Sequence, residues 1–136
     1  MDWVTLSLIA ALAQVSRNAA MKSLGHRLDD GGRIVSVVSA PEIYVNEWTS
    51  FTTKDFPENS EARDGDTVRI VMLDVADDRP VEDVLCTAEA YGTAHSRAGL
   101  APVEIHRPLG GPNEPFEWVS ETEVSPWAIY VLERSD

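Results

Sequence analysis

The chain has 136 residues, 43% of them hydrophobic, and this length supports one domain with one core rather than two domains. Its 23 acidic and 11 basic residues leave a formal net charge of -12, which repels phosphate backbones and anionic membranes and argues against nucleic-acid binding. The single cysteine excludes an internal disulfide, no Cys/His cluster has metal-ligand spacing, and a reducing cytoplasm is the expected compartment.

The most apolar segment, residues 3–15, does not have the properties of a membrane span. It falls short of the roughly 20 apolar residues that a transmembrane helix needs, and it contains Thr5, Ser7 and Gln14. A signal peptide carries positive charge before its apolar run, whereas Asp2 precedes this one. We therefore expect neither a membrane segment nor export.

The first predicted element is a strand over residues 2–9, "DWVTLSLI", which is β-branched and apolar enough to be buried. A helix that runs on through "AALAQV" is the alternative, because Ala and Leu favour helices. Ser16 is then the expected N-cap of a helix that ends at residues 29–32. The apolar face of that helix is expected to carry Ala20, Met21, Leu24 and Leu28.

The second predicted strand is "RIVSVVSA", residues 33–40, whose apolar residues fall on both faces, as in parallel sheets. A polar stretch rich in turn formers follows, and we predict an excursion off the sheet at about residues 46–80. Within it, "TVRIVML" is a strand candidate and "DVADDRP" a charged turn. Excursions of this length often carry function.

The last part of the chain predicts one helix and two strands. Thr87 is the expected cap of the helix and Gly99 its left-handed end. Two strands, "PVEIHRP" and "PWAIYVLER", should follow. The apolar stripe of the helix is expected to contain Leu85, Tyr91, Ala94 and Ala98.

This order of elements resembles the C-terminal half of a class I S-adenosylmethionine-dependent methyltransferase domain. In that family the fourth strand begins with Asp and an apolar run, as in "DWVTLSLI", and two glycines precede the fifth strand, as in "HRLDDGGRIVSVV". A later helix ends in Ala-Gly-Leu before the sixth strand, as in "SRAGLAPVEI", and an antiparallel seventh strand matches "WAIYVLE". The resemblance covers nearly the whole chain.

The resemblance implies a single, truncated α/β domain over residues 1–136, with a partial Rossmann-like sheet of mostly parallel strands and an antiparallel C-terminal strand. The strands at 2–9 and 33–40 should be adjacent and parallel, joined by a right-handed helical crossover. The last strand should lie beside the second, with "PVEIHRP" outside it. The implied activity is methyl transfer from S-adenosylmethionine to a small-molecule acceptor.

The family's main cofactor motif has no match in the chain. A complete domain binds its cofactor at a glycine-rich turn after the first strand and at an acidic residue after the second. The glycine pairs at 31–32 and 110–111 do not form such a strand, turn and helix unit. We therefore expect a fragment that is inactive alone and binds the cofactor weakly or not at all.

A missing first half would leave the strand at 2–9 with an open edge. We expect that edge to pair with a missing N-terminal segment or with a second copy of the chain, or else to cause aggregation. The alternative function is a non-catalytic acidic α/β module that binds a partner, because fold alone does not determine function.

Two sets of residues are candidates for the site. Ligands of open α/β sheets lie beyond the carboxyl ends of the strands. The residues expected to face the cofactor there are Ser7, Leu8 and Ile9. The stretch "PEIYVNEWTSF" is the candidate substrate pocket, with contributions from Glu42, Tyr44, Glu47, Trp48 and Phe51. The alternative is that these aromatic residues anchor the excursion onto the sheet.

We do not expect the remaining residues with reactive or ionisable side chains to form a catalytic site. His106 is expected on the surface, His95 on a helix without a catalytic role, and Cys86 without any role. Trp118 either packs on Phe116 or closes the substrate side. No metal site is expected, although four acidic residues are candidates for a hard cation: Asp55, Glu58, Glu61 and Asp64.

Overall fold

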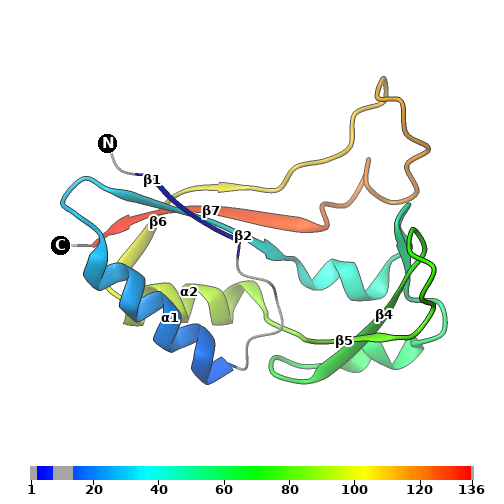
Figure 1. Cartoon of the computed structure of the whole chain (residues 1–136), viewed down its shortest axis with the longest axis horizontal. Helices are drawn as coiled ribbons and strands as arrows, with labels where there is room; N and C mark the ends of the chain where they lie inside the picture. Colours follow the sequence, from blue (N-terminus) through cyan, green and yellow to red (C-terminus); the bar gives the residue numbers. More distant parts are fainter. Residues whose placement is uncertain (1–2, 8–13, 136) are drawn as a thin grey trace.

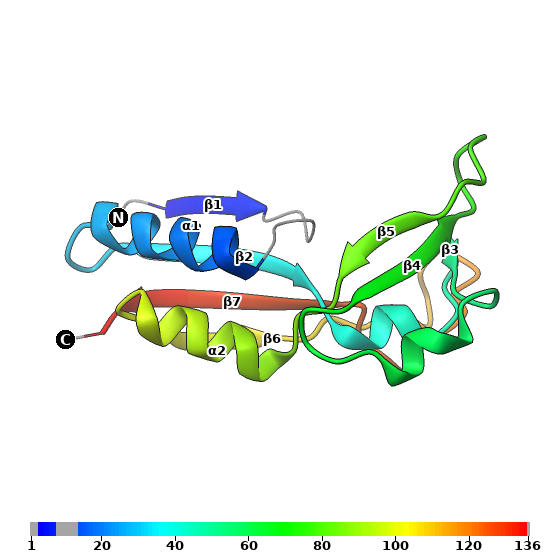
Figure 2. The same cartoon turned by 90° about the horizontal axis from the view of Figure 1, so that it is seen from below.

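The computed structural model describes residues 3–7 and 14–135, with side chains from residue 21 onward. A four-stranded sheet forms its larger part, and two helices lie on one face of this sheet (Figures 1 and 2). The strands, in spatial order, are β1 (Trp3–Ser7), β2 (Arg33–Ser39), β7 (Trp127–Arg134) and β6 (Leu100–His106). The helices are α1 (Gln14–Arg27) and α2 (Ala88–Arg97).

The strand order agrees with the order that the resemblance implied. β1 and β2 are adjacent and parallel, with Trp3 opposite Arg33 and Ser7 opposite Val37. β7 is antiparallel to both β2 and β6, so the expectation of mostly parallel pairing is not met. β1, β2 and β6 nevertheless run in one direction, and their carboxyl ends therefore lie at the same edge of the sheet.

β2 shows that the two faces of the sheet differ. Ile34, Ser36 and Val38 are buried on the face that carries the helices, whereas Val35 and Val37 on the other face are only half-buried. Within the part of the chain that the structure describes, the second face of β2 is therefore less completely covered than the helical face. The buried cluster on the helical face is Met21, Leu28, Ile34, Val38, Cys86, Tyr91, Leu100, Ala128, Tyr130 and Leu132.

The ends of the two helices differ in how well they match the caps predicted from the sequence. α1 begins at Gln14, so Ser16 lies inside the helix and the predicted cap is wrong. The chain turns after α1 through Gly31, whose φ of 79° favours glycine. The Oγ1 atom of Thr87 caps α2 by accepting a hydrogen bond from the Ala90 N–H at 3.2 Å, and Gly99 ends it with φ 71°, both as predicted.

The predicted excursion folds into a second, smaller sheet. Its antiparallel strands are β3 (Phe51–Thr52), β4 (Thr67–Met72) and β5 (Val81–Val84), and the charged turn after β4 is where it was predicted. Two 3₁₀ helices accompany them, η1 (Pro41–Val45) and η2 (Pro57–Glu61). Leu85 joins the core of this region and precedes α2, so its predicted place on the helical stripe is wrong. That core consists of Ile43, Tyr44, Trp48, Val68 and Leu85.

The membrane question has a simple structural answer for the described residues. None of the helices in this part of the chain has the length and apolar character that crossing a membrane requires.

Candidate functional site

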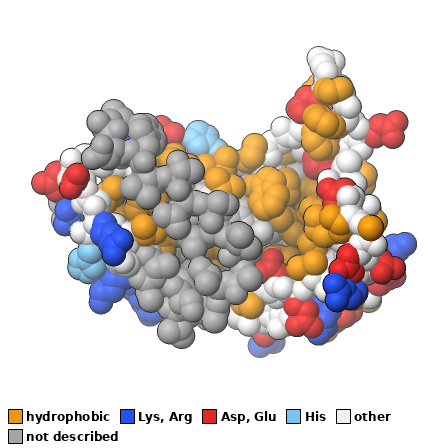
Figure 3. Space-filling view, in the orientation of Figure 1, with side chains coloured by type: hydrophobic (Ala, Val, Ile, Leu, Met, Phe, Trp, Pro, Cys, Tyr) orange, Lys and Arg blue, Asp and Glu red, His pale blue; other side chains and the backbone are white. Residues whose placement is uncertain are grey.

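A cavity of about 780 Å³ opens at the edge of the large sheet where β2 ends and β7 begins. Val37 and Ser39 of β2 and Trp127 and Ile129 of β7 form its floor, and the small sheet and the segment between β6 and β7, residues 107–126, form its walls. Hydrophobic side chains gather on this part of the molecule, beneath the projecting 107–126 segment (Figure 3). In open α/β sheets the carboxyl ends of the strands are where ligands bind.

The wall nearest η1 is aromatic. Tyr44, Trp48 and Phe51 all line the cavity, as predicted from their place in the sequence, and their role in binding remains a prediction. Trp48 is 2% exposed, its indole N–H donates to the Ile43 carbonyl at 2.8 Å, and its ring centroid lies 5.7 Å from that of Phe51. Tyr44 and Trp48 also belong to the apolar core of the small sheet, so they anchor this region as well as bounding the cavity.

A buried phenol and a carboxylate meet at the cavity wall. The Tyr44 hydroxyl donates a hydrogen bond of 2.6 Å to Oδ2 of Asp83, on β5. Burial, followed by the interaction with Asp83, raises the pKa of the Tyr44 phenol far above its ordinary value. Tyr44 therefore remains a hydrogen-bond donor at any physiological pH.

The two glutamates predicted for the pocket do not line it. Glu42 is exposed on η1. Glu47 accepts hydrogen bonds from the Thr52 hydroxyl at 2.5 Å and from the Thr53 N–H at 2.9 Å. Partial burial acts to raise the pKa of Glu47, but these hydrogen bonds outweigh it and the pKa lies below its ordinary value. Glu47 thus holds the chain around β3 and is not directed into the cavity.

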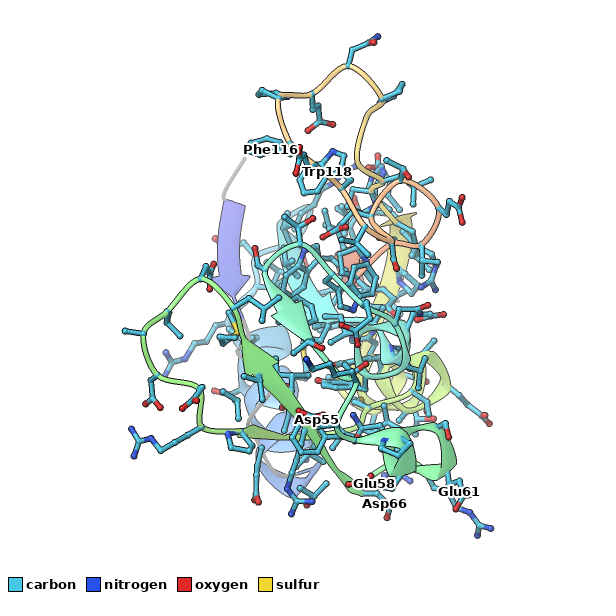
Figure 4. The ribbon with its side chains drawn as sticks, turned by 90° about the vertical axis from the view of Figure 1, so that its right-hand side faces the viewer. Asp55, Glu58, Glu61, Asp66, Phe116 and Trp118 are labelled. Carbon is cyan, nitrogen blue, oxygen red and sulfur yellow. The ribbon has the colours of Figure 1, made fainter. Side chains whose placement is uncertain are left out.

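The 107–126 segment supplies the wall opposite the small sheet. Trp118 packs on Phe116, with ring centroids 4.8 Å apart (Figure 4), as one of its two interpretations predicted. Trp118 also lines the cavity, and its role in closing a substrate site stays a prediction. A Cβ atom at Gly110 would lie 2.7 Å from the indole nitrogen of Trp118, which explains why glycine stands there. That nitrogen is buried and has no hydrogen-bond partner among the described residues.

Glu121 ties the segment to the small-sheet region. Its carboxylate accepts hydrogen bonds from the Thr49 N–H at 2.7 Å and the Val119 N–H at 2.8 Å. Burial acts to raise the pKa of Glu121, but the hydrogen bonds lower it below its ordinary value, so the group is ionised at neutral pH. Sequence reasoning missed Glu121, Asp83, Glu114 and Trp127 as cavity residues, because each comes from a segment distant from "PEIYVNEWTSF".

The predicted cofactor-facing residues are only partly within the described chain. Ser7 is the last residue of β1 and lies opposite Val37, a cavity residue. Leu8 and Ile9 lie outside the described residues. The carboxyl end of β1, at Ser7, therefore lies beside the strand that contributes Val37 to the cavity.

The acidic residues considered for a metal ion lie elsewhere. Asp55, Glu58 and Glu61 lie in the lower part of the view in Figure 4, away from Phe116 and Trp118 in its upper part. Asp64 instead accepts a hydrogen bond of 3.0 Å from the Thr87 N–H. Within residues 3–7 and 14–135, no group of three or more His, Cys, Asp or Glu residues is arranged to hold a metal ion.

The remaining candidates lie in the core or on the surface. His106 is exposed, as predicted, and lies 2.9 Å from Glu104. Cys86 is buried in the core of the large sheet. His95 is 1% exposed among Tyr91 and Tyr130, and neither of its ring nitrogens has a hydrogen-bond partner among the described residues.

Sequence comparison identifies no relatives, because no protein-family model and no curated protein matches the chain. Solved structures do match. A putative S-adenosylmethionine-dependent methyltransferase from Listeria monocytogenes has a TM-score of 0.67 at 13% identity, over 98% of this chain and 61% of that one. The CcbJ methyltransferase from Streptomyces caelestis has a TM-score of 0.56 at 13% identity, over 98% and 60%.

A third match is an S-adenosylmethionine-dependent methyltransferase from Clostridium acetobutylicum ATCC 824, with a TM-score of 0.54 at 10% identity, over 100% of this chain and 59% of that one. The chain therefore has a methyltransferase fold, and it spans about 60% of the length of the structures that it matches. At these identities the likeness concerns the fold alone.

Proposed function

We propose that the chain is the C-terminal part of a class I S-adenosylmethionine-dependent methyltransferase domain and that its cavity lies on the side of the methyl acceptor. The observation that carries this proposal is the place of the cavity, at the carboxyl end of β2 in a sheet with the strand order β1-β2-β7-β6. The fold of the solved methyltransferases supports it.

The geometry suits the requirements of methyl transfer. An enzyme of this kind mainly has to align a nucleophile with the sulfonium methyl group of the cofactor, and it excludes water while doing so. A cofactor bound beyond β1 would lie beside Ser7, whose strand neighbour Val37 is part of the cavity floor. An acceptor in the cavity would then be adjacent to the cofactor.

The same proposal explains the uneven covering of the large sheet. β1 is an edge strand within the described chain, and no described helix covers the face opposite α1 and α2 (Figure 1). Val35 and Ile129 on that face are half-buried. In our proposal an N-terminal half carrying the glycine-rich turn packs along β1 and over this face, and the chain alone is inactive.

Titration calorimetry with S-adenosylmethionine tests the proposal. The isolated chain should show no micromolar binding, because the residues that make the main cofactor contacts in the family are absent from it. The chain joined to the product of the coding sequence upstream of Met1 should bind with a dissociation constant near 1 μM, about -8 kcal/mol.

Two results would contradict the proposal. Micromolar binding by the isolated chain would mean that its own residues form a complete cofactor site. An upstream sequence that encodes no strand followed by a glycine-rich turn would favour the alternative of a non-catalytic partner-binding module.

A further inference from the structure

The cavity is acidic as well as aromatic. Three carboxyl groups line it, from Asp83 on β5 and from Glu114 and Glu121 in the 107–126 segment. No Lys, Arg or His occurs among the described residues that line it. The three groups come from different parts of the chain, so their convergence on one cavity is a property of the fold and not of a charged run in the sequence.

The carboxylates are held in place by the protein but retain the capacity to accept further hydrogen bonds. Asp83 accepts from the Tyr44 hydroxyl, Glu121 from two backbone N–H groups, and Glu114 through Oε1 from the Gly111 N–H. A carboxylate offers about four lone-pair directions, so each can also accept from a ligand. Negative charge in a partly enclosed, low-dielectric site repels anions and attracts cations more strongly than the same charge on an open surface.

The aromatic groups of the cavity also favour a cationic ligand. Three of the four tryptophans of the chain, Trp48, Trp118 and Trp127, line the cavity. Trp127 is 42% exposed, so much of its side chain is open to contact. Indole faces attract cations through their quadrupole and also provide flat apolar contact area.

We infer that the acceptor bound in this cavity carries a positively charged ammonium or quaternary ammonium group on a flat apolar body. Such a nitrogen has no lone pair, so this group binds the acceptor in place and the methyl group goes to a different, uncharged nucleophilic atom of the same molecule. That the ligand is a methyl acceptor rests on the proposed function, whereas the preference of the cavity for cations follows from its walls alone. Nucleotides, carboxylic acids and other anionic molecules are disfavoured, because none of the described residues that line the cavity has a basic side chain to balance their charge.

Tryptophan fluorescence provides a direct test on the full chain at physiological salt. Benzyltrimethylammonium is the cationic probe and 3-phenylpropionate, which has the same ring, is its anionic counterpart. We expect the cation to bind at least tenfold more tightly than the anion. Asp83→Asn and Glu114→Gln should each weaken binding of the cation about fivefold, and Trp127→Leu about threefold.

A matched control separates the cavity from the general attraction of an acidic protein for cations. Glu58→Gln makes the same change in net charge at an exposed position on η2, outside the cavity, and should leave affinity unchanged. Asp83→Asn keeps an oxygen for the Tyr44 hydroxyl, and Glu114 is exposed, so at least one of these variants should fold; their melting temperatures check this.

Three results would overturn the inference: equal or tighter binding of phenylpropionate, no binding of the cation up to millimolar concentration, or an equal loss of affinity in Glu58→Gln. The test is independent of the cofactor titration. A cavity that selects the cation in a chain that does not bind S-adenosylmethionine even when it is joined to the upstream segment would refute the proposed function alone. Cofactor binding without a preference for the cation would refute the ligand class alone.

Discussion

The large sheet and the small sheet are stabilised in different ways. The large sheet packs its helical face on α1 and α2 through a cluster of ten buried hydrophobic residues. The small sheet has strands of two to six residues and a smaller apolar cluster. It depends in addition on polar side chains that bind the backbone of neighbouring segments.

Asn59 is the clearest of these polar anchors. Its side-chain amide donates to the carbonyls of Tyr44 at 3.0 Å and Arg69 at 2.8 Å, and its oxygen accepts from the Arg69 N–H at 3.1 Å. One buried residue of η2 therefore joins η1 to β4. The small-sheet region, which shapes the cavity, therefore depends on specific hydrogen bonds, whereas the large sheet depends on apolar burial.

The largest loss of stability should come from removing the hydrogen bonds of Asn59. Asn59→Ala removes three hydrogen bonds, one to the buried Tyr44 carbonyl and two to the partly buried backbone of Arg69, so we expect a loss of about 3 kcal/mol in the free energy of unfolding. Chemical denaturation measures it. Asn113→Ala, at an exposed position in the 107–126 segment, is the control and should change stability by less than about 0.5 kcal/mol. Equal effects of the two substitutions would refute the anchoring role of Asn59.

A smaller loss of stability is expected from a substitution that disturbs the close packing of α1 against the end of α2. A Cβ atom at Gly25 of α1 would lie 2.5 Å from the Ala98 carbonyl oxygen at the end of α2, so Gly25→Ala must push the helices apart. We expect destabilisation of about 1 to 2 kcal/mol.

Gly92→Ala is the matched control for Gly25→Ala. Gly92 lies inside α2, is exposed, and would have nothing within 4 Å of its Cβ atom. Alanine should therefore stabilise the protein by about 0.5 to 1 kcal/mol through its helix propensity. The same substitution thus has opposite signs at the two sites, and destabilisation by both would show that helix spacing is not the cause.

The smallest effect concerns pH and the core of the large sheet. Burial lowers the pKa of His95, so the folded state takes up its proton at lower pH than the unfolded state does. Stability contributed by neutral His95 is complete above an unfolded pKa of about 6.5 and falls as the pH drops below it.

The difference in stability between pH 7.5 and pH 5.5 measures this effect. The parent should lose stability over this range, and His95→Leu should lose less, because leucine takes up no proton. His26→Gln, at an exposed position near the end of α1, is the control and should behave as the parent does. An unchanged loss in His95→Leu would mean that His95 is not the titrating group.

Much of the large sheet could be predicted from sequence because its signals are local. The Val and Ile run of β2, the cap at Thr87 and the glycine at 99 each determine structure within a few residues. The start of α1 could not be predicted as well, because Ser16 has the chemistry of a cap but the helix begins before it. The half-covered face of β2 depends on what packs over it, which its own residues do not reveal.

The cavity shows the limit of sequence reasoning more sharply. Tyr44, Trp48 and Phe51 are close in sequence and could be grouped as one wall, whereas the partnership of Tyr44 with Asp83 arises only when β5 pairs with β4. Glu47 has the right chemistry for a pocket, but nearby threonine groups satisfy it. Local spacing identified the aromatic wall, and tertiary folding determined which carboxylates joined it.

The most direct test of the central claim, that the large sheet is the unfinished part of a methyltransferase domain, is hydrogen exchange of the isolated chain combined with sedimentation. The account predicts either a monomer whose outward-facing amides in β1 exchange rapidly or a self-associated species in which they are protected, despite the net charge of -12. Joining the upstream segment should protect these amides in a monomer. A folded monomer of the isolated chain in which all the amides of residues 3–7 already resist exchange would contradict the account, because β1 would then have a partner on both sides within this chain.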